Sequence, residues 1–241
     1  MIDEKIHEYD IEASHKRCEK SGLSRDNLYS RKIIGKEELQ KKFAINRELI
    51  LTAIPYMEQL YNFVKGSNYF ALLLDREGCI LNAIGDEGIL DQAFFMKMMP
   101  GAYMDEYNIG TNAMSIALQV DYPVQVSGVD HYIKAYYKWT CSAARILDDT
   151  GKLIGILNLT GYSTSMHPHT LGMVAAASNA IQQMLKIKEI NRVLTKTKMH
   201  METIFHSMPA GIITCDVEDN IILANKKAEE LFGYELSELK P

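Results

Sequence analysis

Long apolar runs are missing from this 241-residue sequence. No run approaches the roughly 18 apolar residues that a membrane-spanning helix needs, and the charged opening Met-Ile-Asp-Glu-Lys-Ile-His-Glu lacks the apolar centre of a secretory signal. We therefore expect a cytoplasmic protein without a membrane partner. Hydrophobic residues make up 47% and charged residues 24% of the chain, which is enough for one sizeable core and allows a second.

Paired cysteines and basic clusters are also absent. Cys18, Cys79, Cys141 and Cys215 lie far apart and form no C-x-x-C pair, so neither a disulfide framework nor a zinc knuckle is indicated. The net charge is -5 and the basic residues are scattered, which gives no footprint for direct contact with nucleic acid. The sequence also lacks G-x-x-x-x-G-K-[ST], and therefore a phosphate cradle for ATP.

The apolar pattern changes from helical to strand-like near residue 68. Before it, residues 11–22 and 37–63 show helical spacing. After it, two hairpins are predicted, 69–75 with 79–84 and 140–147 with 153–159, each around a polar turn that contains glycine. A helix at 112–120 and a strand at 123–126 are predicted between them. This order predicts an α+β fold, with helices packed on an antiparallel sheet.

A long helix is predicted for residues 170–205, which contain no proline and only one glycine, Gly172. Its apolar positions, mostly three or four residues apart, are Met173, Ala177, Ala180, Met184, Ile187, Ile190, Leu194, Met201 and Ile204. The first half of this seam is expected to cover the sheet. The second half is expected to pair with a second copy in a parallel coiled coil, although Thr197 and the step from Ile187 to Ile190 depart from a strict heptad.

Globular structure is expected to resume at residue 207, where a hairpin and then a helix are predicted. Some forty residues cannot close a domain of this kind, so we expect a chain that stops inside its second domain. The predicted organisation is a helical region at 1–64, a sensor domain at 65–170, a signalling helix at 171–206 and an incomplete domain at 207–241.

Several motifs carry a resemblance to a known family. G-T-N at 110–112, W-T-C-S-A-A at 139–144 and H-P-H-T at 167–170 occur in that order, after a helical opening at 11–18. Together they resemble the sensory regions of sigma-54-dependent activators of the acetoin-catabolism and dihydroxyacetone-regulator type. The resemblance implies a GAF domain at 65–170, and residues 208–213 and 224–234 resemble the first half of a PAS domain. Departures are Arg145, where proline is frequent, Asp130, where glutamate is, and His15, where tryptophan is.

The resemblance implies a small-molecule sensor in a longer protein. An ATPase ring domain and a helix-turn-helix would follow this chain, and only those parts would contact RNA polymerase and DNA. No catalytic residue is expected, and no cofactor is assigned. Two alternatives stay open: the same sensor on a histidine kinase or a cyclase, because such modules are portable, and a thiol enzyme with Cys79 or Cys141 as nucleophile. No residue spacing indicates the lowered pKa that a thiol enzyme needs.

Strand alternation places Trp139, Cys141 and Arg145 on one face of the predicted strand at 140–147. Trp139 could give a ligand pocket a broad apolar wall with one N–H donor, and Cys141 a small polarizable neighbour. Both residues are equally compatible with an ordinary core.

Polar residues at 131–137 fall where the resemblance implies a lid over the pocket. His131 and Tyr136 could bind a polar metabolite by hydrogen bonds, and a structural role for His131 is equally open. The predicted ligand-binding residues are Trp139, Cys141, His131, Tyr136 and Arg145. His167 and His169 flank Pro168 and are interpreted as a helix start and not as metal ligands. Glu106, Gly110, Thr111 and Asn112 are expected to shape a turn and a helix cap.

Overall fold

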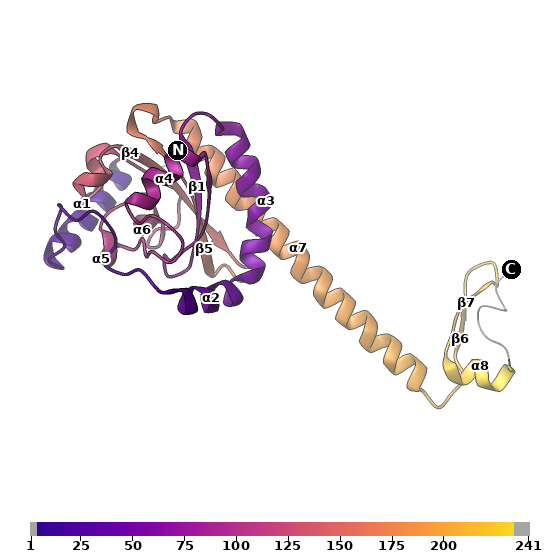
Figure 1. Cartoon of the computed structure of the whole chain (residues 1–241). Helices are drawn as coiled ribbons and strands as arrows, with labels where there is room; N and C mark the ends of the chain where they lie inside the picture. Colours follow the sequence, from indigo (N-terminus) through magenta and orange to yellow (C-terminus); the bar gives the residue numbers. More distant parts are fainter. Residues whose placement is uncertain (1–3, 234–241) are drawn as a thin grey trace. The chain divides into compact units, whose positions relative to one another are not determined.

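The computed structural model describes residues 4–233. The chain divides into two compact units, residues 1–186 and 187–241. Helix α7 (Pro168–Ser207) contributes to both units (Figure 1). The other elements of the first unit are α1 (Glu4–Lys20), α2 (Lys36–Ile45), α3 (Arg47–Val64), β1 (Tyr69–Asp75), β2 (Ile80–Gly85), α4 (Glu87–Phe95), α5 (Glu106–Ile109), α6 (Ala113–Ala117), β3 (Val124–Ser127), η1 (Gly128–Asp130), η2 (Lys134–Tyr136), β4 (Trp139–Leu147), β5 (Leu153–Tyr162) and η3 (Ser163–Ser165).

The centre of the first unit is a five-stranded antiparallel sheet in the order β2-β1-β5-β4-β3. Both predicted hairpins are present, β1 with β2 and β4 with β5, and the α+β prediction is confirmed. The turn before β2 contains Gly78 at φ +84°, a left-handed conformation that glycine adopts without steric cost. Strand β5 is the middle strand, so both of its edges are hydrogen-bonded to neighbours.

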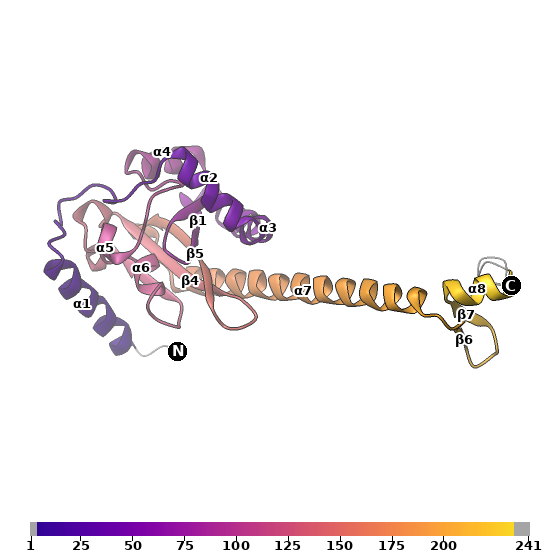
Figure 2. The same ribbon diagram turned by 90° about the horizontal axis from the view of Figure 1, so that it is seen from below.

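Each face of this sheet supports its own hydrophobic core. The inner core contains Phe70, Leu72, Val126, Trp139 and Cys141, and it is covered by α4, α5, α6 and the segment from β3 to β4. The outer core contains Leu73, Leu157 and Leu159 and is covered by α3 and the first part of α7 (Figures 1 and 2). Alternate residues of one strand therefore serve different cores, as the period of two in a strand requires.

The first part of α7 covers the sheet as predicted, with a small offset in the face that it uses. The buried positions are Thr170, Val174, Ser178 and Ile181, which step by four, four and three residues. Met173 and Ala177 of the predicted seam lie half-buried at the border of this stripe. The offset arises because a spacing of three and four defines a stripe but leaves open which of two adjacent stripes meets the sheet.

The second unit contains the rest of α7, β6 (Ile213–Cys215), β7 (Ile221–Ala224) and α8 (Lys226–Phe232). The predicted hairpin and helix are present. Asn225 joins them, because its Oδ1 accepts from the N–H groups of Ile212 and Ala228 while its Nδ2 donates to the carbonyl oxygens of Phe205 and Ala210. The part of the predicted PAS region from residue 234 onward lies outside the described residues.

Beyond Lys186 the apolar side chains of α7 are exposed, apart from the half-buried Phe205. Ile190 is 55% and Leu194 is 64% exposed, and Ile187, Met201 and Ile204 are similar. Within residues 4–233, no helix combines the length and the apolar character that crossing a membrane requires.

Candidate functional site

The inner core contains polar side chains in the middle of the sheet. The register places Cys141 of β4 opposite Thr160 of β5, and Ala143 opposite Asn158. The Thr160 hydroxyl donates to Cys141 Sγ at 3.2 Å, and Asn158 Nδ2 donates to Thr160 Oγ1 at 2.7 Å. All three polar residues are fully buried. They form a short chain of hydrogen bonds across two strands, inside an otherwise apolar core.

Four buried polar atoms near this face have no hydrogen-bond partner among the described residues. They are Trp139 Nε1, Asn158 Oδ1, His131 Nε2 and Arg145 Nε, and the first three belong to residues that are 0% exposed. A buried polar atom without a partner costs about 1–3 kcal/mol, and native proteins pair the great majority of such groups. A donor, an acceptor and an imidazole nitrogen that can serve as either are therefore available to a molecule bound there.

Aromatic rings surround the indole of Trp139. Tyr162 stacks on it with ring centroids 5.3 Å apart, and Phe70 of β1 meets it edge-on at 5.8 Å. Lys138 places its ammonium 4.8 Å from the indole centroid, a cation–π arrangement. The indole is thus fixed in orientation by its neighbours.

The segment from β3 to β4 covers the inner core and brings His131 and Tyr136 together. Their rings meet edge-on at 6.1 Å, and His131 Nδ1 lies 3.2 Å from the carbonyl oxygen of Gly128. The preceding helical region holds this segment in place. Tyr132 donates its hydroxyl to the carbonyl oxygen of Leu23, and the N–H of Lys134 donates to that of Arg25, both at 2.9 Å.

Burial keeps the titratable groups of the inner core uncharged. It lowers the pKa of His131 to about 4 and raises that of the Cys141 thiol to about 12. Burial also raises the pKa of Tyr136. At neutral pH, this part of the molecule therefore offers neutral hydrogen-bonding groups.

Of the predicted site residues, Trp139, Cys141 and Tyr136 belong to one hydrophobic core, His131 meets Tyr136 edge-on, and Arg145 lies farther along β4. Arg145 is six residues from Trp139 along β4, about 20 Å at the usual rise of a strand. Its guanidinium donates to the carbonyl oxygen of Val120 at 3.1 Å. Arg145 thus lies where β4 passes the end of α6.

The predicted turn residues perform the structural role expected of them. Asn112 starts α6 with a capping box, since its Oδ1 accepts from the Ser115 N–H and Ser115 Oγ accepts from the Asn112 N–H. Gly110 has φ +82°, and a Cβ at this position would lie 2.9 Å from the Tyr132 side chain. Glu106 has a further role, because it accepts hydrogen bonds from Ser14 and Arg17 of α1.

His167 and His169 lie at the start of α7. The His169 N–H donates to His167 Nδ1, and the Thr170 hydroxyl donates to the carbonyl oxygen of His167. Within residues 4–233, no group of three histidine, cysteine or acidic side chains is arranged for a metal ion.

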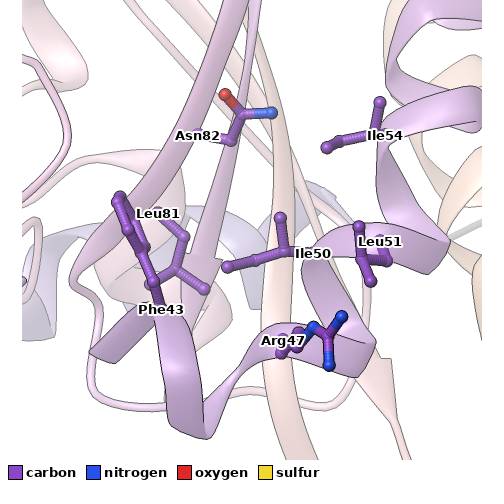
Figure 3. Close-up of a pocket in the computed structure, with 7 residues that line it drawn as sticks. All are labelled: Phe43, Arg47, Ile50, Leu51, Ile54, Leu81 and Asn82. Carbon is purple, nitrogen blue, oxygen red and sulfur yellow. The ribbon is translucent and has the colours of Figure 1, made fainter. Parts of the chain in front are cut away.

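Two open hollows lie on the outer side of the sheet. One, of about 320 Å³, lies between α2, α3 and β2 (Figure 3). It is lined by Phe43, Arg47, Ile50, Leu51, Ile54, Leu81 and Asn82. The other, of about 280 Å³, lies between α3 and α7 and is lined mostly by Tyr56, Phe63 and alanines of α7. Neither hollow contains a predicted site residue.

Comparison with known proteins shows that the chain is similar to the amino-acid sequences of transcription regulators. It is 39% identical over 218 residues, 90% of its length, to the signal-transduction and transcriptional-control protein of Clostridium beijerinckii. It is 30% identical over 225 residues, 93% of its length, to the acetoin dehydrogenase operon transcriptional activator AcoR of Bacillus subtilis (strain 168). The chain spans 34% and 37% of these two relatives.

The fold has a close match among solved structures. The crystal structure of the E. coli DhaR(N)-DhaL complex superposes with a TM-score of 0.88 at 20% identity, covering 96% of this chain and 79% of that chain. Residues 199–241 match the PAS domain family. The chain belongs to the sensory regions of the acetoin- and dihydroxyacetone-regulator type. The resemblance inferred from its motifs is confirmed.

Membership of this regulator type bears on the thiol-enzyme alternative, because the relatives are named as regulators and not as enzymes. The geometry points the same way. Burial raises the pKa of Cys79 to about 12, as it does for Cys141. A nucleophilic cysteine needs a lowered pKa and some exposure, and both thiols are fully buried.

Two residues of the inner core, Asn158 and Thr160, were not singled out from the sequence. Their signal is their position in Gly155-Ile-Leu-Asn-Leu-Thr-Gly161, an apolar run of a middle strand. Polar side chains two residues apart on such a strand share a buried face, and a buried polar group needs a reason.

Proposed function

We propose that this chain is the signal-sensing region of a cytoplasmic bacterial transcription regulator and that it binds a small, uncharged metabolite at the inner core. Trp139, Cys141, His131 and Tyr136 would contact the ligand. Arg145 would act at the end of β4 and not in the ligand contact itself. The metabolite would exchange its hydrogen bonds with water for hydrogen bonds with the protein, so the free energy gained depends on complementarity.

One observation carries this proposal: unpaired donor and acceptor atoms lie fully buried in one core, next to a stacked indole. An ordinary core would lose stability by keeping Trp139 Nε1 and Asn158 Oδ1 unpaired. A ligand with both a donor and an acceptor would satisfy them. The buried groups His131 and Cys141 are neutral at pH 7, so their side of the core favours an uncharged ligand.

The binding signal would reach α7 through β4. This strand carries Trp139 and Cys141 on its inner side, and its far end is hydrogen-bonded to α7. The Ser178 hydroxyl donates to the carbonyl oxygen of Arg145, and the Leu147 N–H donates to Gln182 Oε1 at 2.9 Å. A shift of β4 on binding would therefore change the packing of α7, and a difference in ligand affinity between two arrangements suffices as the mechanism.

The output would lie in the part of a longer protein that this chain does not include. The name of the B. subtilis relative, a transcriptional activator, supports control of transcription. An ATPase ring and a DNA-binding domain would supply contact with RNA polymerase and DNA, and the second half of α7 would pair with a second copy. The sensor on a histidine kinase or a cyclase remains the alternative. Because the E. coli structure holds DhaR(N) with DhaL, a protein partner is a second class of input.

Thermal unfolding of this chain against diols, hydroxyketones, hydroxyacids and amines tests the proposal. We expect an uncharged compound to raise the melting temperature along RT ln(1 + [L]/Kd). The increase should vanish in Trp139→Phe or Cys141→Ala, provided that the variant folds.

Cys79→Ala is the matched control, because Cys79 is equally buried but lies outside the inner core, at the start of the β1–β2 pairing. It should lower the melting temperature of the unliganded chain and leave the ligand-induced increase intact. If no compound stabilises the wild type, the metabolite-sensing role of the inner core is wrong.

A further inference from the structure

Asn158 occupies a fully enclosed position in the middle of the sheet. It lies on the middle strand β5, with Leu72 of β1 opposite it on one side and Ala143 of β4 on the other. All three residues are 0% exposed. Helix α6 packs against β3, β4 and β5 on this face of the sheet. An amide at this position can reach no bulk water, so its hydrogen bonds are made by the protein or by a bound molecule.

Hydrogen bonding fixes the direction in which the Asn158 amide points. The Thr160 hydroxyl has one hydrogen, which it donates to Cys141 Sγ, so its Oγ1 is left to accept. Only the NH2 end of Asn158 can donate to Oγ1, at 2.7 Å. The Oδ1 end must therefore face away from Thr160, where it has no partner among the described residues. Thr160 and Cys141 thus act as positioning residues for this acceptor.

We infer that Asn158 is the specificity-determining residue of the proposed ligand site, and that its Oδ1 accepts a hydrogen bond from an uncharged hydroxyl or N–H group of the ligand. The inference rests on the proposed function of the inner core. A ligand without such a donor would leave Oδ1 unpaired, whereas a ligand with one would satisfy it. Sites built to hydrogen-bond a substrate group discriminate strongly against analogues that lack the group, for this reason.

Asn158→Leu distinguishes a role in ligand binding from a role in stability, because leucine has the same branched arrangement of heavy atoms as asparagine and carries no polar atom. It removes a buried acceptor that is unpaired in the free chain, so the melting temperature of the unliganded variant should stay the same or rise. Its affinity for the compound that stabilises the wild type should fall at least tenfold. Calorimetric titration with that compound measures this change.

Thr140→Val is the matched control. Thr140 is also buried on β4 with an unpaired hydroxyl oxygen, but it lies on the opposite side of the strand from Trp139 and Cys141. This variant should change the melting temperature in the same direction and leave ligand affinity within about twofold, well below the tenfold step of 1.4 kcal/mol. Thr160→Val removes only the group that orients the amide, and should weaken binding while the unliganded chain stays folded.

The wild-type chain gives a test that needs no variant. Each stabilising compound is compared with its O-methyl or N-methyl derivative that lacks the donor hydrogen, and the derivative should bind at least tenfold more weakly. Equal binding of the two, or unchanged affinity in a folded Asn158→Leu or Thr160→Val variant, would overturn the role of Asn158 while metabolite binding stands. A wild type that no compound stabilises would instead contradict the proposed function itself.

Discussion

The buried imidazole of His131 links stability to pH. Burial lowers its pKa from the ordinary value near 6.5 to about 4, so in this interval the unfolded chain binds a proton that the folded chain does not. The stability contributed by the neutral imidazole is complete above pH 6.5 and is lost as the pH falls toward 4. We expect a loss of about 2 kcal/mol in the free energy of unfolding between pH 7 and pH 5, measured by urea denaturation.

His131→Gln provides the comparison, since glutamine keeps a polar group but does not titrate. Its free energy of unfolding should depend on pH more weakly than that of the wild type by about the same 2 kcal/mol. Identical pH dependence in the two proteins would mean that the imidazole of His131 is accessible to protons in the folded state.

Single residues of the site were predictable to different degrees. The alternation of side chains along a strand is sufficient to place Trp139 and Cys141 on one face. The distance of Arg145 from Trp139 along β4 was not predicted, because alternation gives the face of a residue but not its distance along the strand to a site. Asn158 was missed because its significance depends on the absence of a partner for one atom, and hydrogen-bond pairing across strands is a tertiary property.

The carboxylate of Glu106 makes several hydrogen bonds that attach helix α1 to the rest of the first unit. Arg17 makes two hydrogen bonds to it, and Ser14 and Gln119 one each, all between 2.7 and 2.9 Å. Burial raises the pKa of Glu106, but these hydrogen bonds lower it by a larger amount, so the net shift of the pKa is downward. The carboxylate therefore remains charged and holds α1 against α5 and α6.

Glu106→Gln should loosen α1 without unfolding the sheet. The substitution removes the charge and replaces one acceptor oxygen with a donor. The free energy of unfolding should fall by about 1–2 kcal/mol, a modest loss because solvent screens the half-exposed Arg17. Amide hydrogen exchange in residues 7–20 should speed up, while exchange in β1 and β5 stays the same.

Glu19→Gln serves as the control for this change, because its ion pair with Arg25 is exposed on both sides. It should cost less than about 0.5 kcal/mol and leave exchange in α1 unaltered. An equal effect of the two substitutions would show that α1 is held by its apolar contacts and not by Glu106.

The boundaries of elements followed the sequence where proline or glycine marked them. Helix α7 begins at Pro168 and ends two residues before Pro209, close to the predicted 170–205. Helix α6 was predicted to reach residue 120 but ends at Ala117. The N–H groups of Gln119 and Val120 both donate to the carbonyl oxygen of Ile116, so the helix tightens and closes early. The spacing of apolar residues does not indicate this tightening, so the early end of α6 could not be predicted from it.

The exposed apolar positions of α7 beyond Lys186 predict a dimer of the chain. Ile187, Ile190, Leu194, Met201 and Ile204 fit steps of three and four when Thr197 is included, the spacing of a coiled-coil seam. We expect light scattering to give twice the chain mass of 27.3 kDa for the wild type. The double variant Ile190→Glu, Leu194→Glu should give a single chain mass, since four glutamates would meet in one seam.

Lys196→Glu also reverses charge on α7 but lies off this seam, so it should leave the dimer intact. A wild type that is monomeric at tens of micromolar, or a double variant that stays dimeric, would contradict pairing through this helix.

The division of one sheet between two cores has a consequence for engineering and for evolution. The residues proposed to touch the metabolite belong to the inner core, whereas the strand end and helix that would pass on the signal belong to the outer core. Substitutions on one side of the strands can thus accumulate without repacking the other. A library confined to the inner positions of β4 and β5 could retune the chain into biosensors for new compounds, each reporting through an unchanged helix.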